Sequence, residues 1–309
     1  IPDAEMRWRK EICRVAEIAF RSVSKIYEEE EGLFDFSVDI AKGESFGLLG
    51  PTGSGKSTAL SLLMGFIRPD EGEVTIGGLD CFSKRHVITK RVGYMPKDAA
   101  LPRRTTGEEF INLMARARGG VGKSRTRDLM ERLNLNPLGD FSFMPLQERR
   151  KTLLLLALMH GPEILLLDDP FAGLDPNAQI AVIDLISEER GKGKTIVMTS
   201  HIFEQVQRCC DRAGIIRKGR LVTIQSTQAL AVTRQKVYHI TFENLKQASA
   251  FAQEWDTGAE LLRNRVIVAV PSSPQALINT LSKYMVLDLV GGREELEDSF
   301  LRSFGGDLL

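Results

Sequence analysis

The sequence contains little cysteine and carries no net charge. Only 4 of its 309 residues are cysteine, and their positions lack the spacing of zinc ligands. We expect the adjacent Cys209 and Cys210 to lie unpaired in a reducing compartment rather than to bridge each other. Lysine and arginine together number 41, as do aspartate and glutamate. This balance argues against a protein that coats nucleic acid, so we expect no nucleic-acid partner.

Long hydrophobic runs are also absent. The longest, residues 153–159, is far shorter than the roughly 18–20 residues that span a bilayer, and no signal peptide opens the chain. The first residue is Ile1 rather than methionine. We expect that the sequence is trimmed or cut from a longer polypeptide, so the absence of a membrane segment here excludes none elsewhere.

Hydrophobic residues make up 43% of the chain, which is enough for a sizeable core and excludes disordered and fibrous classes. The length predicts two domains, or one large domain with an appendage. Strand-like and helical segments alternate along residues 1–225, which predicts a parallel sheet covered by helices. The expected strands are residues 14–20, 33–40, 44–49, 72–77, 164–167, 195–199 and 213–216.

Residues 107–160 interrupt this alternation with helical stretches at 107–118, 124–133 and 145–160. We interpret the span from about 100 to 162 as a helical insertion. Residues 226–309 follow a third pattern, with strands expected at 236–242, 265–270 and 285–290 and helices at 245–254, 274–283 and 294–304. They predict a small C-terminal α+β domain of the split βαβ kind.

One segment matches the phosphate-binding motif G-x-x-x-x-G-K-[ST]. It lies between an apolar strand and a helix, and it consists of Gly50, Pro51, Thr52, Gly53, Ser54, Gly55, Lys56 and Ser57, with Thr58 following. Glycines let backbone N–H groups converge on phosphate oxygens, and the helix N-terminus adds its positive end. We expect Lys56 to reach the β- and γ-phosphates and the Ser57 hydroxyl to bind Mg²⁺. The alternative is an ordinary glycine-rich turn, but such a turn would not need every fixed residue of the motif to be present.

A pair of aspartates follows a second apolar strand. Residues 164–167 are all apolar, as in a parallel strand buried on both faces, and Asp168 and Asp169 come directly after them. Ligands bind at the carboxyl ends of such strands. We therefore expect Asp168 to help hold Mg²⁺ and Asp169 to orient or deprotonate the attacking water. The alternative for either residue is a helix cap or a turn.

With three further motifs, the chain resembles the nucleotide-binding subunit of an ATP-binding-cassette (ABC) transporter over residues 11–225. The motifs follow in the order phosphate loop, Gly93-Tyr94-Met95-Pro96, Leu167-Asp168-Asp169-Pro170, Gly173-Leu174-Asp175-Pro176 and Thr199-Ser200-His201. The resemblance implies an α/β P-loop NTPase fold for residues 1–225. It also implies that Tyr27 stacks on adenine and that His201 contacts the γ-phosphate. The alternative for Tyr27 is an ordinary core or surface tyrosine, and the alternative for His201 is a structural histidine.

The same resemblance implies cofactors and partners. ATP and Mg²⁺ would bind at the phosphate loop, and a second nucleotide-binding domain would complete the site as a homodimer or a heterodimer. A transmembrane permease subunit or domain would hold the chain at the cytoplasmic face of a membrane. Residues 293–301 further resemble the ending of the ATPase subunits of ABC-2-type exporters, which favours export.

Three departures from the family's pattern bear on hydrolysis. Lys97 stands where a glutamine usually follows Tyr-Met-Pro, and an ammonium group donates hydrogen bonds but cannot bind a metal. We expect Lys97 to pair with phosphate; the alternatives are a lysine that faces solvent or one that faces the membrane partner. Asp169 replaces the usual catalytic glutamate and is shorter by one methylene.

The third departure is the missing signature Leu-Ser-Gly-Gly-Gln. Counting back from Asp168 without gaps places Met144-Pro145-Leu146-Gln147-Glu148 at that position. This segment offers neither a serine hydroxyl nor a glycine, and Glu148 would bring a negative charge toward the γ-phosphate. A shifted register would use Ser142, but it needs extra residues before Asp168.

The leading interpretation is therefore an ATPase subunit that powers transport and hydrolyses ATP slowly. The alternative is a regulatory or switch subunit that binds ATP and scarcely hydrolyses it. A soluble ABC protein of translation or DNA repair is disfavoured, because the chain has neither two cassettes nor long coiled coils or zinc insertions.

Overall fold

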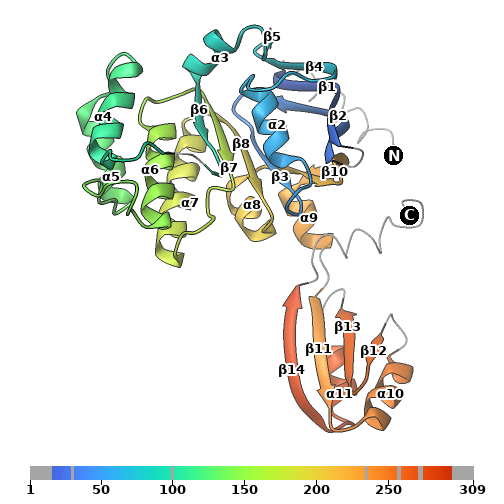
Figure 1. Cartoon of the computed structure of the whole chain (residues 1–309). Helices are drawn as coiled ribbons and strands as arrows, with labels where there is room; N and C mark the ends of the chain where they lie inside the picture. The colour runs from blue at the N-terminus through green and yellow to red at the C-terminus, as the bar shows by residue number, and fades with distance from the viewer. Residues whose placement is uncertain are drawn as a thin grey trace. The chain divides into compact units, whose positions relative to one another are not determined.

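The structure, a computed structural model, describes residues 16–28, 31–98, 101–233, 236–255, 259–270 and 274–293. Contacts between residues divide the chain into two units, residues 1–227 and residues 228–309. Figure 1 shows the first unit from blue to yellow and the second in orange and red.

The central sheet of the first unit has six strands in the order β10-β9-β3-β8-β7-β6. All neighbours pair in parallel except β9 and β10. Strands β3, β7 and β8 are buried along their whole length, as expected when both faces are covered. The strands are β3 (Ser45–Leu49), β6 (Val92–Met95), β7 (Ile164–Asp168), β8 (Thr195–Ser200), β9 (Arg212–Arg217) and β10 (Arg220–Ser226). This confirms the predicted parallel α/β fold.

A second, antiparallel sheet has the order β2-β1-β4-β5. Its strands are β1 (Ala16–Glu28), β2 (Glu31–Ala41), β4 (Glu71–Ile76) and β5 (Leu79–Asp80). We had grouped the segments 14–20, 33–40 and 72–77 with the parallel sheet, and this grouping was wrong. Strands β1 and β2 follow each other without a helix between them, and a parallel pair needs such a crossover.

Helix α2 (Lys56–Leu63) lies in the core that joins the two sheets. Its side chains Leu60 and Leu63 belong to one buried cluster with Phe20 and Phe36 of the antiparallel sheet and Phe46 of the parallel sheet. Because α2 starts directly after the phosphate loop, this packing fixes the loop at the carboxyl end of β3.

The predicted helical insertion is present. It contains α4 (Gly107–Ala117), α5 (Lys123–Arg132) and α6 (Leu146–Leu158), which lie together at one side of the first unit in green (Figure 1). Helix α4 begins with a capping box, in which the Thr106 side chain accepts from the Glu109 backbone and the Glu109 side chain accepts from the Thr106 backbone. Helix α6 packs against β6, and this contact joins the insertion to the parallel sheet.

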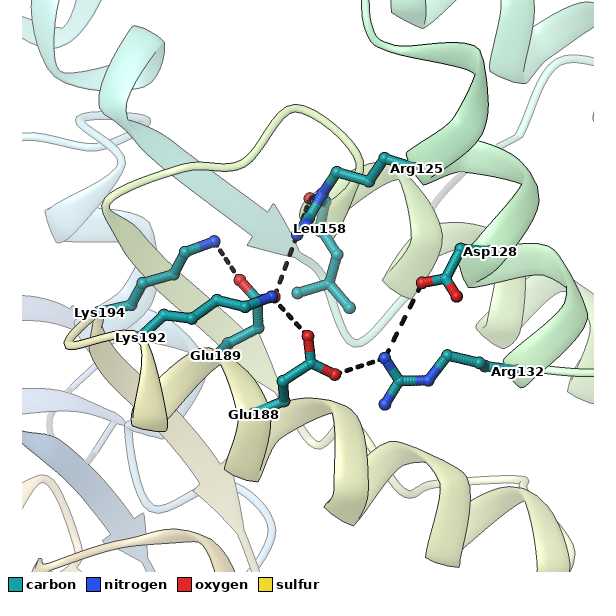
Figure 2. Close-up of polar contacts among 8 residues, drawn as sticks. All are labelled: Arg125, Asp128, Arg132, Leu158, Glu188, Glu189, Lys192 and Lys194. Atoms are coloured by element: carbon teal, nitrogen blue, oxygen red, sulfur yellow. Dashed lines mark hydrogen bonds and ion pairs between the residues drawn. The ribbon is translucent and has the colours of Figure 1, made fainter.

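A network of charged side chains ties the insertion to α7 (Pro176–Gly191). Figure 2 shows its members, which are Arg125, Asp128, Arg132, Leu158, Glu188, Glu189, Lys192 and Lys194. Glu189 is 2% exposed and pairs with Arg125 at 3.1 Å, with Lys192 at 2.9 Å and with Lys194. Arg125 also donates to the carbonyl of Leu158 at 3.2 Å. The C-terminal end of α6 is therefore fixed to α7 through Arg125.

Two more helices lie in the described part of the first unit: α3 (Arg85–Arg91), which precedes β6, and α8 (Phe203–Cys209), which packs on β3 and β8. Cys81, Cys209 and Cys210 are buried and free, as predicted for the adjacent pair. Burial raises the pKa of the Cys209 thiol to about 12. Within the described ranges, none of the helices is long and apolar enough to cross a membrane.

Beyond α9 (Thr227–Thr233), the second unit is an antiparallel sheet with the order β12-β13-β11-β14. Its elements are β11 (Lys236–Phe242), α10 (Leu245–Glu254), β12 (Glu260–Leu262), β13 (Arg265–Val270), α11 (Gln275–Leu281) and β14 (Val286–Arg293). This order is that of a split βαβ unit, as predicted. The helix expected at 294–304 lies outside the described residues.

Candidate functional site

The phosphate loop connects β3 to α2 and depends on glycine at a sharp turn. Gly55 has a φ of +100°, which L side chains rarely adopt, and a Cβ there would lie 2.7 Å from the carbonyl oxygen of Gly32. Gly50 donates its N–H to the carbonyl of Ser200 at the end of β8. The loop is thereby fixed between the two sheets, with its helix beginning at Lys56.

The Lys56 side chain lies along this loop. Its Nζ donates to the carbonyls of Gly50 and Pro51 at 2.6 Å each and to the Ser54 hydroxyl at 3.5 Å. These contacts hold the ammonium group against the backbone carbonyls of the phosphate loop, and its contact with the β- and γ-phosphates stays a prediction.

Thr199 holds the two aspartates at the end of β7, Asp168 as its last residue and Asp169 directly after it. The Thr199 hydroxyl donates to Asp168 Oδ1 at 2.6 Å and accepts from the Asp169 backbone N–H at 3.0 Å. Asp168 is 3% exposed, so its carboxylate is held within a buried hydrogen bond. Thr199 belongs to the motif Thr199-Ser200-His201, and no role was predicted for it from the sequence.

Asp169 has an unusual backbone conformation for a residue with a side chain. Its φ of +48° lies in the left-handed region, which costs about 1–3 kcal/mol and persists only where the surroundings enforce it. The residue is 6% exposed, and its Oδ2 lies 3.5 Å from His201 Nδ1. Its Oδ1 has no hydrogen-bond partner within the part of the chain that the structure describes. A buried carboxylate oxygen without a protein partner is suited to binding a water molecule.

A hollow of about 250 Å³ joins these groups. Every residue that we predicted for the site lines it except Gly50, Pro51 and Ser54, which belong to the same loop. Glu31 and Gly32 also line the hollow, and neither was predicted for the site from the sequence. Only the pairing of β1 with β2 brings Glu31 to this position.

Tyr27 and Lys97 enter the hollow from opposite parts of the fold. Tyr27 comes from the end of β1 and is 53% exposed, so its ring is available for stacking. Lys97 follows β6, and its side chain faces the same hollow as Lys56. The site thus has two ammonium groups beside two buried carboxylates.

The segment at the signature position has other contacts than we expected. Helix α6 begins at Leu146, directly after Pro145, and Leu146 is 61% exposed. We expected Glu148 to bring a negative charge toward phosphate. Its carboxylate instead accepts from Lys151 at 2.9 Å and from the Asn136 backbone at 3.1 Å, so it is neutralised within the insertion.

The comparisons with known proteins agree with this geometry. The family model for the ABC transporter matches residues 33–172. The Nod factor export ATP-binding protein I of Sinorhizobium fredii (strain NBRC 101917 / NGR234) is 31% identical over 94% of this chain and 87% of its own length. The linearmycin resistance ATP-binding protein LnrL of Bacillus subtilis (strain 168) is 31% identical over 66% of this chain and 67% of its own length.

A solved structure shows the same fold. It is a dimeric ATP-binding cassette in a post-hydrolysis state, bound to ADP and Pi, and it superposes with a TM-score of 0.60 at 22% identity. The match covers 68% of this chain and 98% of that one. ATPases of this family work as dimers with transmembrane permease partners. The chain therefore belongs to the ABC transporter family, as an ATP-binding and ATP-hydrolysing subunit that powers a membrane transporter.

Proposed function

We propose that this chain is the ATPase subunit of an ABC-2-type exporter and that ATP binds in the hollow with Mg²⁺. The phosphates would lie on the loop from Gly50 to Ser57, beside Lys56, and adenine would stack on Tyr27. The Ser57 hydroxyl and the Asp168 carboxylate would hold Mg²⁺, because this ion prefers oxygen ligands and keeps several waters of its own. When bound, Mg²⁺ neutralises charge that develops on the phosphates.

The observation that carries the proposal is the Asp169 carboxylate. It is buried, held in a left-handed backbone conformation, and has one oxygen without a partner among the described residues. Asp169 would accept a proton from the attacking water, the water oxygen would bond to the γ-phosphorus, and the bond from this phosphorus to the bridging oxygen would break to release ADP and inorganic phosphate. His201 would contact the γ-phosphate, and Lys97 would add positive charge beside it.

Partners of two kinds follow from this proposal. A second nucleotide-binding domain would complete the site, and a permease would hold the chain at the cytoplasmic face of a membrane. A second hollow of about 560 Å³, lined by Phe66 and Arg85 among others, supports a docking surface, since Phe66 is 58% exposed. Phe66 also packs edge-on against Tyr94, at 5.6 Å between ring centroids, which connects this surface to the strand before Lys97. Residues 226–309 would form an accessory domain.

One observation favours the alternative of a regulatory subunit with poor hydrolysis. Leu146 occupies the position of a signature glycine, and its Cδ2 would lie 3.0 Å from a Cβ built on Gly173. A leucine side chain at this position supplies no hydrogen-bond donor to an opposing phosphate and prevents a close backbone approach. The site that this segment would complete on the opposing chain is therefore weakened.

The experiment that separates the two functions is steady-state ATP turnover of the full chain, co-purified with its permease in lipid vesicles. An exporter ATPase should turn over repeatedly and export a substrate that depends on this turnover. A regulatory subunit should bind ATP with no turnover above that of the permease and its second ATPase domain alone. Pro145→Ser combined with Leu146→Gly restores two signature residues and should raise turnover only if the missing signature limits hydrolysis.

A further inference from the structure

Arg150 is a buried arginine that the proposed reaction does not yet use. It lies in the first half of α6 and is only 3% exposed. Arginine is almost never buried to this extent unless it is paired. In the sequence, it stands beside Arg149 ahead of an apolar run, and nothing there distinguishes it from a solvated helical arginine.

The guanidinium group of Arg150 donates to two loops of the site. Its Nη1 donates to the carbonyl of Pro96 at 3.0 Å and to that of Lys97. Its Nη2 donates to the carbonyl of Asp168 at 3.2 Å and to that of Asp169. Only a planar fork with several N–H groups can reach these carbonyls at once, and a lysine ammonium cannot reproduce this geometry.

These bonds act on the backbone of the residue that we place as the base. Asp169 adopts a φ of +48°, which is unfavourable for a residue with a Cβ and must be enforced by neighbours. Thr199 accepts from its N–H and Arg150 donates to its carbonyl. The two contacts hold Asp169 on both sides and thereby set the direction of its carboxylate.

The charge of Arg150 also suits this position. Burial lowers the pKa of its guanidinium, while the carboxylates of Asp169 and Asp168 oppose that shift. The cation in turn offsets part of the negative charge that the two aspartates bring into a buried site. Its Nε donates to no acceptor in the described ranges, so Arg150 holds the two loops through its Nη groups.

Helix α6 connects Arg150 to the surface at the signature position. In the first turn of α6, Gln147 Nε2 donates to Asp175 Oδ2 at 2.5 Å, and Asp175 caps α7 through the Ala178 N–H at 2.9 Å. A displacement of α6 would therefore move Arg150, and with it the loops after β6 and β7, in one step.

We propose that Arg150, which lies on the helix at the signature position, is a positioning residue. It holds the Asp169 carboxylate and the Lys97 loop in the orientation that hydrolysis requires. This inference rests on the proposed role of Asp169 as the base. Arg150 is not among the residues that line the hollow. It acts through the backbone carbonyls that it holds.

The test is Arg150→Lys in the full chain, measured for ATP turnover, ATP affinity and thermal unfolding. The charge stays but the fork is lost, so kcat should fall about ten- to a hundredfold, as for a misplaced reacting group. The Kd for ATP should rise by less than kcat falls, because the phosphate loop is unchanged and only the cation on the Lys97 loop is displaced. The matched control is Arg118→Lys, since Arg118 is a partly buried arginine that donates to the carbonyl of Thr89 at 2.6 Å, away from the hollow. The control should leave kcat unchanged.

Two results would overturn the inference. One is an unchanged kcat in Arg150→Lys, and the other is a parallel loss of kcat, ATP affinity and thermal stability, which is the sign of a merely structural role. If Arg150→Lys does not fold, Arg150→Gln retains two N–H donors and is judged by the same split between kcat and Kd. The variant Asp169→Asn distinguishes a wrong positioning role for Arg150 from a wrong base. If it abolishes turnover while Arg150→Lys leaves kcat unchanged, only the positioning role is wrong; if Asp169→Asn turns over normally, the proposed base is wrong.

Discussion

His201 Nδ1 lies 3.5 Å from Asp169 Oδ2, and the two residues come from the ends of neighbouring parallel strands. Asp169 is buried, whereas the His201 side chain is 52% exposed. Both residues line the hollow, the carboxylate as a buried group and the imidazole as an exposed one. In the reaction that we propose, this arrangement would place the carboxylate for proton transfer and the imidazole for contact with phosphate.

Lys56 should be required for tight ATP binding. Lys56→Ala removes a cation from the phosphate loop, and charge-assisted hydrogen bonds contribute about 1.5–3 kcal/mol each. The Kd for MgATP should rise about tenfold or more in a calorimetric titration. Lys42→Ala, at an exposed lysine outside the hollow, should leave the Kd unchanged. Undiminished ATP binding by Lys56→Ala would refute the assignment of the phosphate loop.

Lys97 should serve phosphate rather than the permease. A charge pair at about 4 Å contributes roughly 4 kcal/mol at an effective dielectric of 20, before desolvation. Lys97→Gln should therefore weaken ATP binding, or ATP-driven dimerisation, in the isolated subunit, as measured by titration and by sedimentation. If both are unchanged and only assembly with the permease suffers, Lys97 belongs to the docking surface instead.

The network around Glu189 should stabilise the contact between the insertion and α7. Glu189→Gln removes a buried carboxylate from three partly exposed cations, and the loss of hydrogen bonds to a charged group costs about 1.5–3 kcal/mol. Urea unfolding followed by circular dichroism should report this loss. The control is Glu188→Gln, whose side chain is 42% exposed, and its effect should stay below about 1 kcal/mol. Equal effects of the two variants would contradict the role given to burial.

The same network predicts how stability depends on pH. Burial alone would raise the pKa of Glu189, but hydrogen bonds from Lys194, Lys192 and Arg125 outweigh it and lower the pKa. Hydrogen bonds from Lys192 and Arg132 also lower the pKa of Glu188 to about 2, but its side chain is 42% exposed, so solvent screening keeps its contribution to stability small. A carboxyl group with a lowered pKa stabilises the folded chain above its unfolded pKa, and this contribution is lost as pH falls through the folded pKa.

The difference in unfolding free energy between the parent chain and Glu189→Gln should therefore stay constant from about pH 7 to about pH 5 and shrink as pH falls below the unfolded pKa of 4.5. Urea unfolding at a series of pH values measures this difference directly. A difference that grows over the same interval would show that the charged form of Glu189 does not stabilise the fold.

Much of the fold follows from local patterns in the sequence. Apolar runs such as residues 164–167 and the glycine-rich loop determine the parallel sheet, because strand and helix propensities agree there with the final packing. The short strand β6 was missed, since Gly93 interrupts its apolar pattern. The structure explains this glycine, because a Cβ there would lie 2.0 Å from the carbonyl oxygen of Ala157. Such a close approach between elements is set by tertiary packing and leaves no local signal.

The site was predictable only as far as its motifs extend. The spacing within the phosphate loop and the position of Asp168 and Asp169 after a strand indicate chemistry directly. The roles of Thr199 and Arg150 depend on which loops lie side by side in the folded chain, and neither residue type is unusual where it stands. The antiparallel sheet, which brings Glu31 to the hollow, was not predicted for the same reason.

The central claim is that Asp169 is the base for ATP hydrolysis in this chain, and Asp169→Asn tests it most directly. The substitution keeps the size of the side chain and removes its charge, so it should abolish steady-state turnover while the Kd for MgATP stays within about twofold of the parent value. Both quantities should be measured on the full chain with its permease present. If Asp169→Asn hydrolyses ATP as fast as the parent chain, Asp169 is not the base and the account of the site is wrong.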